Sequence, residues 1–143
     1  MITTSSKYET VMFIDDSEID NLINNHLIRK SNFASKVCIH NGPGSALEYL
    51  QKVSSDNLHP ELIPDIIFLD INMPIMNGFQ FLDEYEKIAK VIKKPIKIVI
   101  LSSSVDPADL QHSKENKYII KMIHKPLSYE ALDELLEEGS PLF

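Results

Sequence analysis

The stretch IIFLDINMPIMNGFQFL, residues 66–82, decides the fold of this chain. It begins with four apolar residues, 66–69, that show no alternation of polar and apolar side chains. A short run of this kind is typical of a strand in a parallel sheet that helices cover on both faces. The run ends at Asp70, and Asn77 and Gly78 form a turn before a segment with the apolar spacing of a helix. The stretch therefore predicts a strand, a loop that begins with an aspartate, and a helix.

Outward from this stretch, strand-like and helix-like segments alternate along the chain. Short apolar runs rich in β-branched and aromatic residues predict five strands. These runs span residues 11–14, 37–39, 66–71, 96–101 and 119–123. Five alternations of strand and helix imply right-handed crossovers and an open sheet. We therefore expect an α/β fold with a doubly wound five-stranded parallel sheet and helices on both faces.

The predicted helices differ in how clearly their sequences mark them. The first has four apolar residues at the spacing of one helical face, and they are Ile19, Leu22, Ile23 and Leu27. Such a stripe ordinarily packs on the core, and Ser17 with Asp20 can cap the start of this helix. Asp106 and Pro107 supply an N-cap and a first helical position for the fourth helix. Apolar spacing places the others, with Ala46, Leu47 and Leu50 in the second, Phe79, Leu82 and Tyr85 in the third, and Leu132, Leu135 and Leu136 in the last, after Ser128.

Length and composition limit the class of protein. A chain of 143 residues predicts one domain, 1–143, with a core at about 8–138. The single cysteine, Cys38, can form no internal disulfide, which fits a reducing, intracellular setting. A net charge of −7, from 14 basic and 21 acidic residues, counts against nucleic acid or an anionic membrane as a partner. Because the start of the chain is polar and its apolar runs are short, we expect a cytoplasmic protein that is neither exported nor membrane-spanning.

Polar and charged side chains follow the ends of four predicted strands. They are Asp15 and Asp16 after the first strand, Asp70 after the third, Ser102 after the fourth, and Lys125 after the fifth. In open α/β sheets, ligands bind outside the carboxyl ends of the strands. Each residue taken alone has an ordinary explanation as a helix cap, a strand end, a polar loop or a surface lysine. Their shared place at one edge of the sheet favours a binding site.

Four motifs give the chain a resemblance to a known family. They are FIDDSEID at 13–20, IIFLDINMPIMNGFQFL at 66–82, VILSSS at 99–104 and IHKPLS at 123–128. In this order and spacing they resemble the receiver domain of bacterial two-component response regulators, and the resemblance runs from about residue 8 to 138. The chain is similar to the single-domain type represented by the chemotaxis response regulator. The resemblance implies the flavodoxin-like receiver fold.

The resemblance also implies a phosphoryl-acceptor site. Asp70 would be phosphorylated by a partner histidine kinase or histidine phosphotransferase. Asp16, Asp70 and the backbone carbonyl of Asn72 would hold Mg²⁺, and Asp15 would act on the ion largely through water. The residue types suit this chemistry, because clustered carboxylates repel one another and hold protons, and a divalent cation relieves that repulsion.

The resemblance also implies a conformational switch, although the chain departs from the family pattern at one position. Ser102 would be the switch hydroxyl that bonds the new phosphoryl group, and Lys125 would contact another phosphoryl oxygen. The peptide bond before Pro126 is commonly cis in the family. Many members carry Tyr or Phe three residues before the lysine, where this chain has Met122. Tyr118 is a candidate substitute that lies out of register with the motif.

The function that follows is a stand-alone receiver, a phosphoacceptor and not an enzyme, that signals to a downstream protein target. The alternative is a phosphorylation-independent interaction module on the same scaffold. A hydrolase is a third hypothesis, but the aspartate hydrolases it would resemble carry an Asp-x-Asp pattern where this chain has Asn72. The sequence leaves open the cognate kinase, the pathway, the lifetime of the phosphorylated state and whether phosphorylation drives dimerisation.

Overall fold

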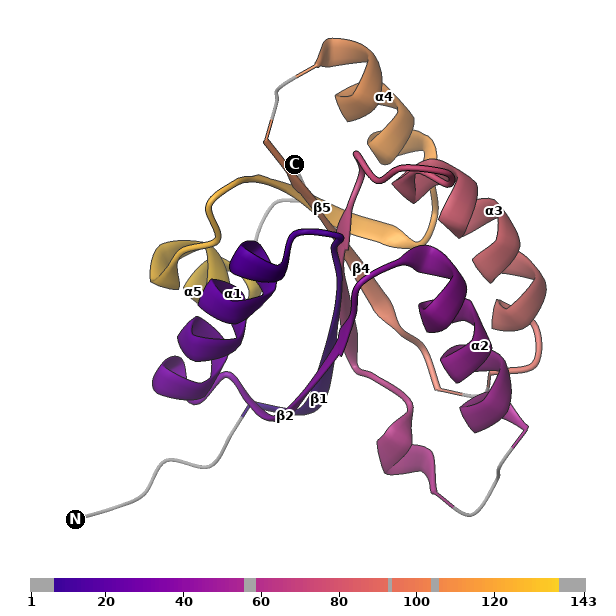
Figure 1. Cartoon of the computed structure of the whole chain (residues 1–143), viewed down its shortest axis with the longest axis horizontal. Coiled ribbons are helices and arrows are strands. Elements are labelled where there is room, and N and C mark those ends of the chain that lie inside the picture. The colour runs from indigo at the N-terminus through magenta and orange to yellow at the C-terminus, as the bar shows by residue number, and fades with distance from the viewer. Residues whose placement is uncertain (1–6, 56–58, 93, 104–105, 137–143) are drawn as a thin grey trace.

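A parallel sheet forms the centre of the protein. A computed structural model describes residues 7–55, 59–92, 94–103 and 106–136. Their five strands lie in the order β2-β1-β3-β4-β5 (Figure 1). The strands are β1 (Tyr8–Ile14), β2 (Ala34–His40), β3 (Ile66–Asp70), β4 (Lys97–Ser102) and β5 (Ile119–His124). All neighbouring strands in this sheet pair in parallel, so the predicted doubly wound α/β fold is confirmed.

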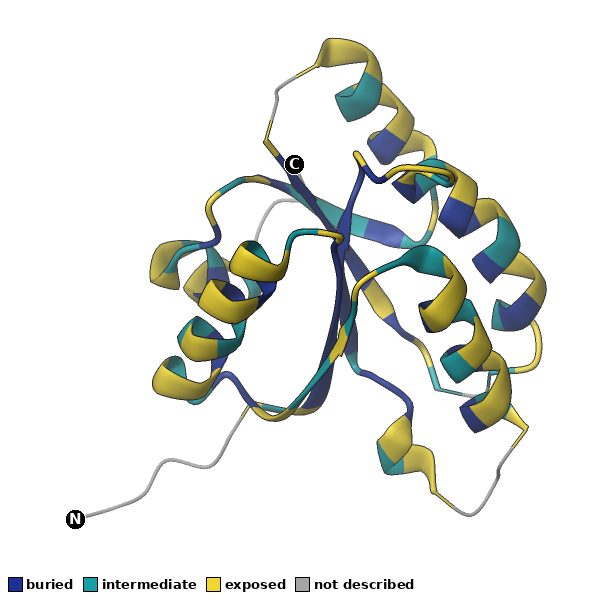
Figure 2. Cartoon of the chain, viewed as in Figure 1, coloured by how far each residue is buried: buried dark blue, intermediate teal, exposed yellow. Residues whose placement is uncertain are grey.

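Helices cover both faces of the sheet. They are α1 (Glu18–Ser31), α2 (Pro43–Ser54), α3 (Gly78–Ala89), α4 (Pro107–Glu115) and α5 (Tyr129–Leu136), with a short 3₁₀ helix η1 (Pro60–Leu62) before β3. Helices α1 and α5 lie on one face, and α2 and α3 lie on the other with α4 beside them (Figure 1). Figure 2 shows that the central strands are buried while the outer sides of the helices are exposed. The central strands therefore lie between two layers of helices.

Two apolar clusters form the core, one on each face of the sheet. In β1, Met12 and Ile14 point to the cluster under α2 and α3, whereas Val11 and Phe13 point to the cluster under α1 and α5. Every residue of β3 is buried. The absence of polar alternation in the 66–69 run thus reflects helices on both sides. The rings of Phe13 and Phe68 stack with their centroids 4.7 Å apart, which ties β1 to β3.

The predicted helix caps are present. The Ser17 side chain accepts a hydrogen bond of 3.2 Å from the backbone N–H of Asp20 at the start of α1. At the start of α4, the Asp106 carboxylate accepts one of 2.8 Å from the backbone N–H of Ala108, and Pro107 is the first helical residue. These bonds satisfy N–H groups that have no partner within the helix. Local chemistry therefore fixes where both helices begin.

Most of the apolar stripe of α1 does not pack on the core, contrary to what its amphipathic spacing predicted, and Leu27 is the one member of the four that does. Three of its members face solvent, and we call them the α1 apolar surface: Ile19 and Leu22, each 70% exposed, and Ile23, 54% exposed. The buried residues of this helix are Asn21, Asn24 and Ile28. The Asn21 amide N–H group donates hydrogen bonds to the backbone oxygen of Asp15 at 2.8 Å and to the Asn41 side chain at 3.2 Å. Polar contacts at the carboxyl edge of β1 thus set the orientation of α1.

Some predictions concern residues that the structure does not describe. Ser104 of the fourth-strand motif and the last two residues of the predicted core, 137 and 138, are outside the described residues. The single-domain organisation over 1–143 stays a prediction. Within the described ranges, no helix combines the length and apolar character needed to cross a bilayer.

Candidate functional site

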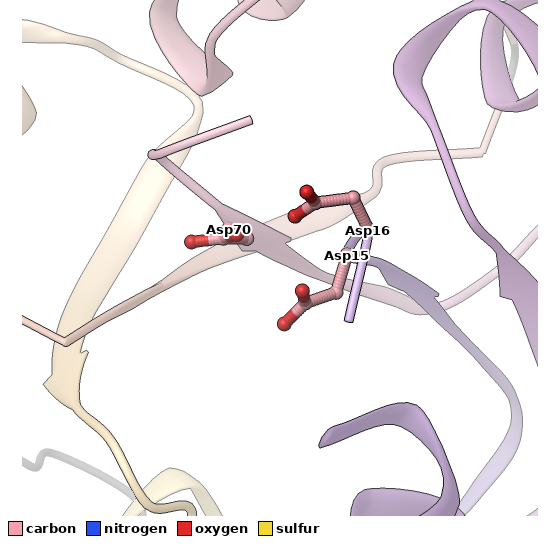
Figure 3. A group of neighbouring side chains, drawn as sticks. All are labelled: Asp15, Asp16 and Asp70. Carbon is pink, nitrogen blue, oxygen red and sulfur yellow. The ribbon is translucent and has the colours of Figure 1, made fainter. Parts of the chain in front are cut away.

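Three carboxylates meet at the carboxyl edge of the sheet. Asp15 and Asp16 directly follow β1, and Asp70 is the last residue of β3, which pairs with β1. One carboxylate oxygen from each of the three lies within 4.8 Å of the others (Figure 3). Asp15 and Asp70 are buried, while Asp16 is exposed. The predicted convergence of these side chains is confirmed, and we call this group the acidic pocket.

The loop after β3 fixes the position of Asp70. The backbone N–H of Asn72 donates a hydrogen bond of 3.2 Å to the Asp70 carboxylate, and the N–H of Gly78 donates one of 2.9 Å to the Ile71 carbonyl. A Cβ atom at Gly78 would lie only 3.0 Å from the carbonyl oxygen of Asp70 and the Cα atom of Ile71. The absence of a side chain at Gly78 therefore permits the close approach of α3 to the acidic pocket.

The same loop holds a strained and exposed residue. Ile75 has a φ of 69° and its side chain is fully exposed. A β-branched residue rarely adopts this left-handed conformation, and such strain concentrates at functional sites. Asn77 then ends the loop as the N-cap of α3, in a capping box with Gln80 whose two hydrogen bonds are both 2.9 Å. The predicted turn at Asn77 and Gly78 is the first turn of the helix itself.

Lys125 brings a positive charge into the acidic pocket from the end of β5. Its ammonium nitrogen lies 2.8 Å from a carboxylate oxygen of Asp15, 3.0 Å from one of Asp20 and 3.7 Å from one of Asp70. Its backbone N–H donates a 2.7 Å hydrogen bond to the carbonyl of Ser102. The peptide bond between Lys125 and Pro126 is cis, as the family resemblance implied. The predicted lysine is therefore in the pocket.

Asp20 is a site residue that sequence reasoning did not assign. Its role in the sequence analysis was restricted to the start of α1, where its backbone N–H does bond Ser17. Its carboxylate instead reaches Lys125, 105 positions away along the chain. No spacing rule connects residues so far apart, although the place of Asp20 one turn after the acidic pair was a signal that it faces the same edge.

Burial and charge set the protonation behaviour of the pocket. Burial raises the pKa of Asp70 to about 6, and the negative charge of Asp15 adds to the rise while Lys125 opposes it. Burial alone would lower the pKa of Lys125, but the hydrogen bonds that its ammonium group donates to Asp15 and Asp20 outweigh this effect, so the pKa is raised. Two buried carboxylates thus compete for one cation. An additional positive charge beside Asp70 would favour its ionised form.

Ser102 lies at the same edge of the sheet, and the residues around it differ from the family pattern. It is the buried last residue of β4 and is in register with His124 of β5. Met122 packs against the core below α2 and α3, with its sulfur 3.8 Å from the Ser113 hydroxyl of α4. Tyr118 lies just before the first residue of β5, at the opposite end of the strand. Tyr118 therefore does not take the place of the family's aromatic residue.

A family model and solved structures match this chain. The model for the response regulator receiver domain matches residues 11–137. The crystal structure of a two-component response regulator from Cytophaga hutchinsonii is 28% identical with a TM-score of 0.80, and the match covers 90% of this chain and 93% of that chain. A response regulator receiver protein from Dyadobacter fermentans is 31% identical with a TM-score of 0.77, and covers 90% of this chain and 94% of that chain. The match of the sequence to the family model and the match of the fold to solved structures therefore indicate the same family.

A curated relative is much longer than this chain. Protein-glutamate methylesterase/protein-glutamine glutaminase 3 from Burkholderia thailandensis is 32% identical over 93 residues. The match covers 65% of this chain and 22% of that protein. This chain thus resembles only a fraction of that relative.

Proposed function

Because this chain belongs to the response regulator receiver domain family, we propose that it is a switch that accepts a phosphoryl group on Asp70 in a two-component phosphorelay. The observation that carries the proposal is the acidic pocket with Lys125 inside it. Asp70 is held by the Asn72 amide, faces two further carboxylates and lies 3.7 Å from the lysine nitrogen. This is the set of charges that phosphoryl transfer to a carboxylate needs.

The transfer uses the ionised form of Asp70, because only the anion is an effective nucleophile. A carboxylate oxygen of Asp70 attacks the phosphorus of a phosphohistidine whose other ring nitrogen is protonated. The new O–P bond forms as the P–N bond breaks, and the electron pair of the P–N bond stays on the imidazole nitrogen. The products are an acyl phosphate on Asp70 and a neutral imidazole on the donor.

The acidic pocket suits Mg²⁺. Asp16, Asp70 and the carbonyl of Asn72 would hold the ion, with Asp15 acting largely through water. All of these donors are oxygens, which Mg²⁺ prefers. Burial, with the negative charge of Asp15, raises the pKa of Asp70, and a cation would favour the ionised form again. When bound, Mg²⁺ neutralises charge on the transferring phosphoryl group. The residues present therefore fit the ion.

The switch follows from the charge that phosphorylation adds. A phosphoryl group brings nearly two negative charges and strong hydrogen-bond acceptors. Lys125 would bind one of its oxygens, and the Ser102 hydroxyl would donate to another. Because Ser102 ends β4 and Lys125 follows β5, both contacts act on the surface formed by α4, β5 and α5. A few kcal/mol of differential contact suffices to shift such a two-state equilibrium.

The proposed partners are proteins of the cytoplasm. Receiver domains interact with histidine kinases, and the proposed donor here is a histidine kinase or histidine phosphotransferase. The α1 apolar surface begins at Ile19, next to Asp20, whose carboxylate contacts Lys125, and supports docking of the donor at this place. A downstream protein target would read the α4, β5 and α5 surface. Nucleic acid and membrane are not proposed as partners.

Mass spectrometry after treatment with phosphoramidate and Mg²⁺ tests the proposal. We expect one added phosphate on the wild-type protein and none on the Asp70→Asn variant. Asp83→Asn, an exposed carboxylate in α3, is the matched control and should label like the wild type. Labelling that persists in Asp70→Asn would remove the assignment of Asp70.

Two other outcomes would identify the alternatives. Native partner binding that is indifferent to Mg²⁺, phosphodonor and Asp70→Asn would indicate a phosphorylation-independent interaction module. Sustained multiple turnover of a small phosphate ester would indicate a hydrolase. A slow single release of phosphate from the labelled protein agrees with a phosphoacceptor and with neither alternative.

A further inference from the structure

Two carboxylates that are not the phosphoacceptor hold the lysine of the pocket. The ammonium nitrogen of Lys125 lies 2.8 Å from Asp15 and 3.0 Å from Asp20, but 3.7 Å from Asp70. In the proposed function, this ammonium group must contact a phosphoryl group attached to Asp70. The third N–H of the ammonium group is left for a phosphoryl oxygen. Movement of the nitrogen toward a phosphoryl group on Asp70 would lengthen at least one of the two short ion pairs.

Asp20 differs from Asp15 in what else its carboxylate does. The Asp15 side chain is buried, accepts a 2.9 Å hydrogen bond from the Ser17 N–H and belongs to the acidic pocket. The Asp20 side chain is 39% exposed and lies outside the three carboxylates that approach one another within 4.8 Å. Lys125 is its one ion-pair partner among the residues that the structure describes. The Asp20 carboxylate is therefore placed to hold the lysine and not to complete the acidic pocket.

We propose that Asp20 is a positioning residue that retains Lys125 in the unphosphorylated protein and so opposes phosphorylation of Asp70. The proposal rests on the proposed function and adds a residue that regulates it. Phosphorylation draws the lysine toward the phosphoryl oxygens, at the expense of the pair with Asp20. Because Asp20 is also an anion beside the pocket, it repels an approaching phosphoryl donor. Both effects act in the same direction.

Removal of the Asp20 charge should therefore speed labelling. We expect Asp20→Asn to accept phosphate from phosphoramidate with Mg²⁺ about three- to fivefold faster than the wild type, the upper part of the range for a partly exposed ion pair. Asp20→Glu keeps the charge and should stay within about twofold of the wild type. The control is Glu18→Gln, since Glu18 is exposed in the same helical turn and makes no ion pair with any described residue. It should also stay within about twofold.

A double-mutant cycle separates positioning from a general charge effect. In a Lys125→Met background, Asp20→Asn should change the labelling rate by less than about twofold, because the ion pair is already absent and only the weaker repulsion of the donor by the partly exposed Asp20 charge remains. Equal acceleration in both backgrounds would overturn the positioning role, and so would a wild-type rate in Asp20→Asn alone. Thermal melts would identify any variant that fails to fold, and Asp20→Glu then tests the same contact.

A second measurement needs no phosphorylation. The NMR signals of the Lys125 side chain report its hydrogen bonds, and they should shift in Asp20→Asn but not in Glu18→Gln. An unchanged lysine spectrum in Asp20→Asn would refute the contact. Labelling of the Asp70→Asn variant at the level of the wild type would instead overturn the proposed function. The two failures are thus distinguishable.

Discussion

Replacement of Asp70 by asparagine should stabilise the metal-free protein near neutral pH. The carboxylate is 5% exposed and faces the negative charge of Asp15, so the folded state disfavours its ionised form. The asparagine side chain has nearly the same shape and can still accept a hydrogen bond from the Asn72 amide. The substitution therefore removes the unfavourable charge and creates no cavity.

The magnitude follows from the pKa of Asp70, which rises from the ordinary 3.8 to about 6 in the folded protein. Each pKa unit corresponds to about 1.4 kcal/mol, so the ionised group costs the folded state up to about 3 kcal/mol. Between about pH 4 and 6 the folded state binds more protons at this group than the unfolded state does. The contribution of Asp70 to stability therefore falls as the pH rises through this window. The advantage of Asp70→Asn should be full above about pH 6 and small near pH 4.

Urea unfolding followed by circular dichroism measures this advantage. The experiment needs a chelator, because a bound cation would offset the repulsion in the wild type. We expect Asp70→Asn to unfold with a free energy about 2 to 3 kcal/mol higher than the wild type at about pH 7.5. Asp83→Asn removes an exposed carboxylate from α3 and should change it by less than about 0.5 kcal/mol. No advantage at neutral pH, or one that does not shrink toward about pH 4, would refute the reasoning.

Further variants of the pocket and its surroundings have outcomes that can be measured. Mg²⁺ at a hundredfold excess over its dissociation constant should add about 2.7 kcal/mol of stability to the wild type in thermal melts, and much less to Asp16→Asn; equal gains would contradict the metal assignment. Gly78→Ala should cost about 1–3 kcal/mol in urea unfolding, because its Cβ would lie 3.0 Å from backbone atoms beside Asp70. Unchanged stability would show that the loop tolerates the added atom. Leu22→Asp should slow phosphoryl transfer from the cognate histidine donor more than it slows labelling by phosphoramidate, and equal effects would exclude donor docking at the α1 apolar surface. Ser102→Ala should still accept phosphate but show smaller amide chemical-shift changes in β5 and α5, and changes as large as those of the wild type would refute its switch role.

The sheet and its polar edge could be predicted because each strand is a short apolar run and the polar residues directly follow these runs in the sequence. Consecutive side chains of a strand point to opposite faces, and all four residues before Asp70 are apolar. The structure buries all of β3. Each of the other predicted strands is present with small differences at its ends. Parallel pairing then places the carboxyl ends together. The positions of Asp15, Asp16 and Lys125 follow from that rule.

The orientation of α1 could not be predicted in the same way. Helical spacing shows which residues share a face, but it does not show which face packs against the sheet. The side that carries Ile19 and Leu22 was expected to be inside because it is apolar. In the structure, Asn21 bonds the backbone of Asp15 and turns that side outward. A polar contact with the end of β1 outweighs the apolar stripe.

The role of Asp20 depends on a contact between distant parts of the chain. Its carboxylate meets Lys125 because α1 begins at the same sheet edge at which β5 ends. A single sequence contains no record of such pairing. The three-dimensional arrangement is needed to distinguish a residue that only starts a helix from one that also holds the ammonium group of Lys125.

Under the proposed function, the outward apolar side of α1 separates recognition of the donor from folding. Since Leu22 and its neighbours bury little surface, mutations there carry a small penalty in stability. After gene duplication, sister proteins can therefore diverge at these positions and acquire different upstream donors while the chemistry of the pocket stays intact. Cross-talk between parallel signalling routes can be suppressed in this way by a few surface substitutions on one helix.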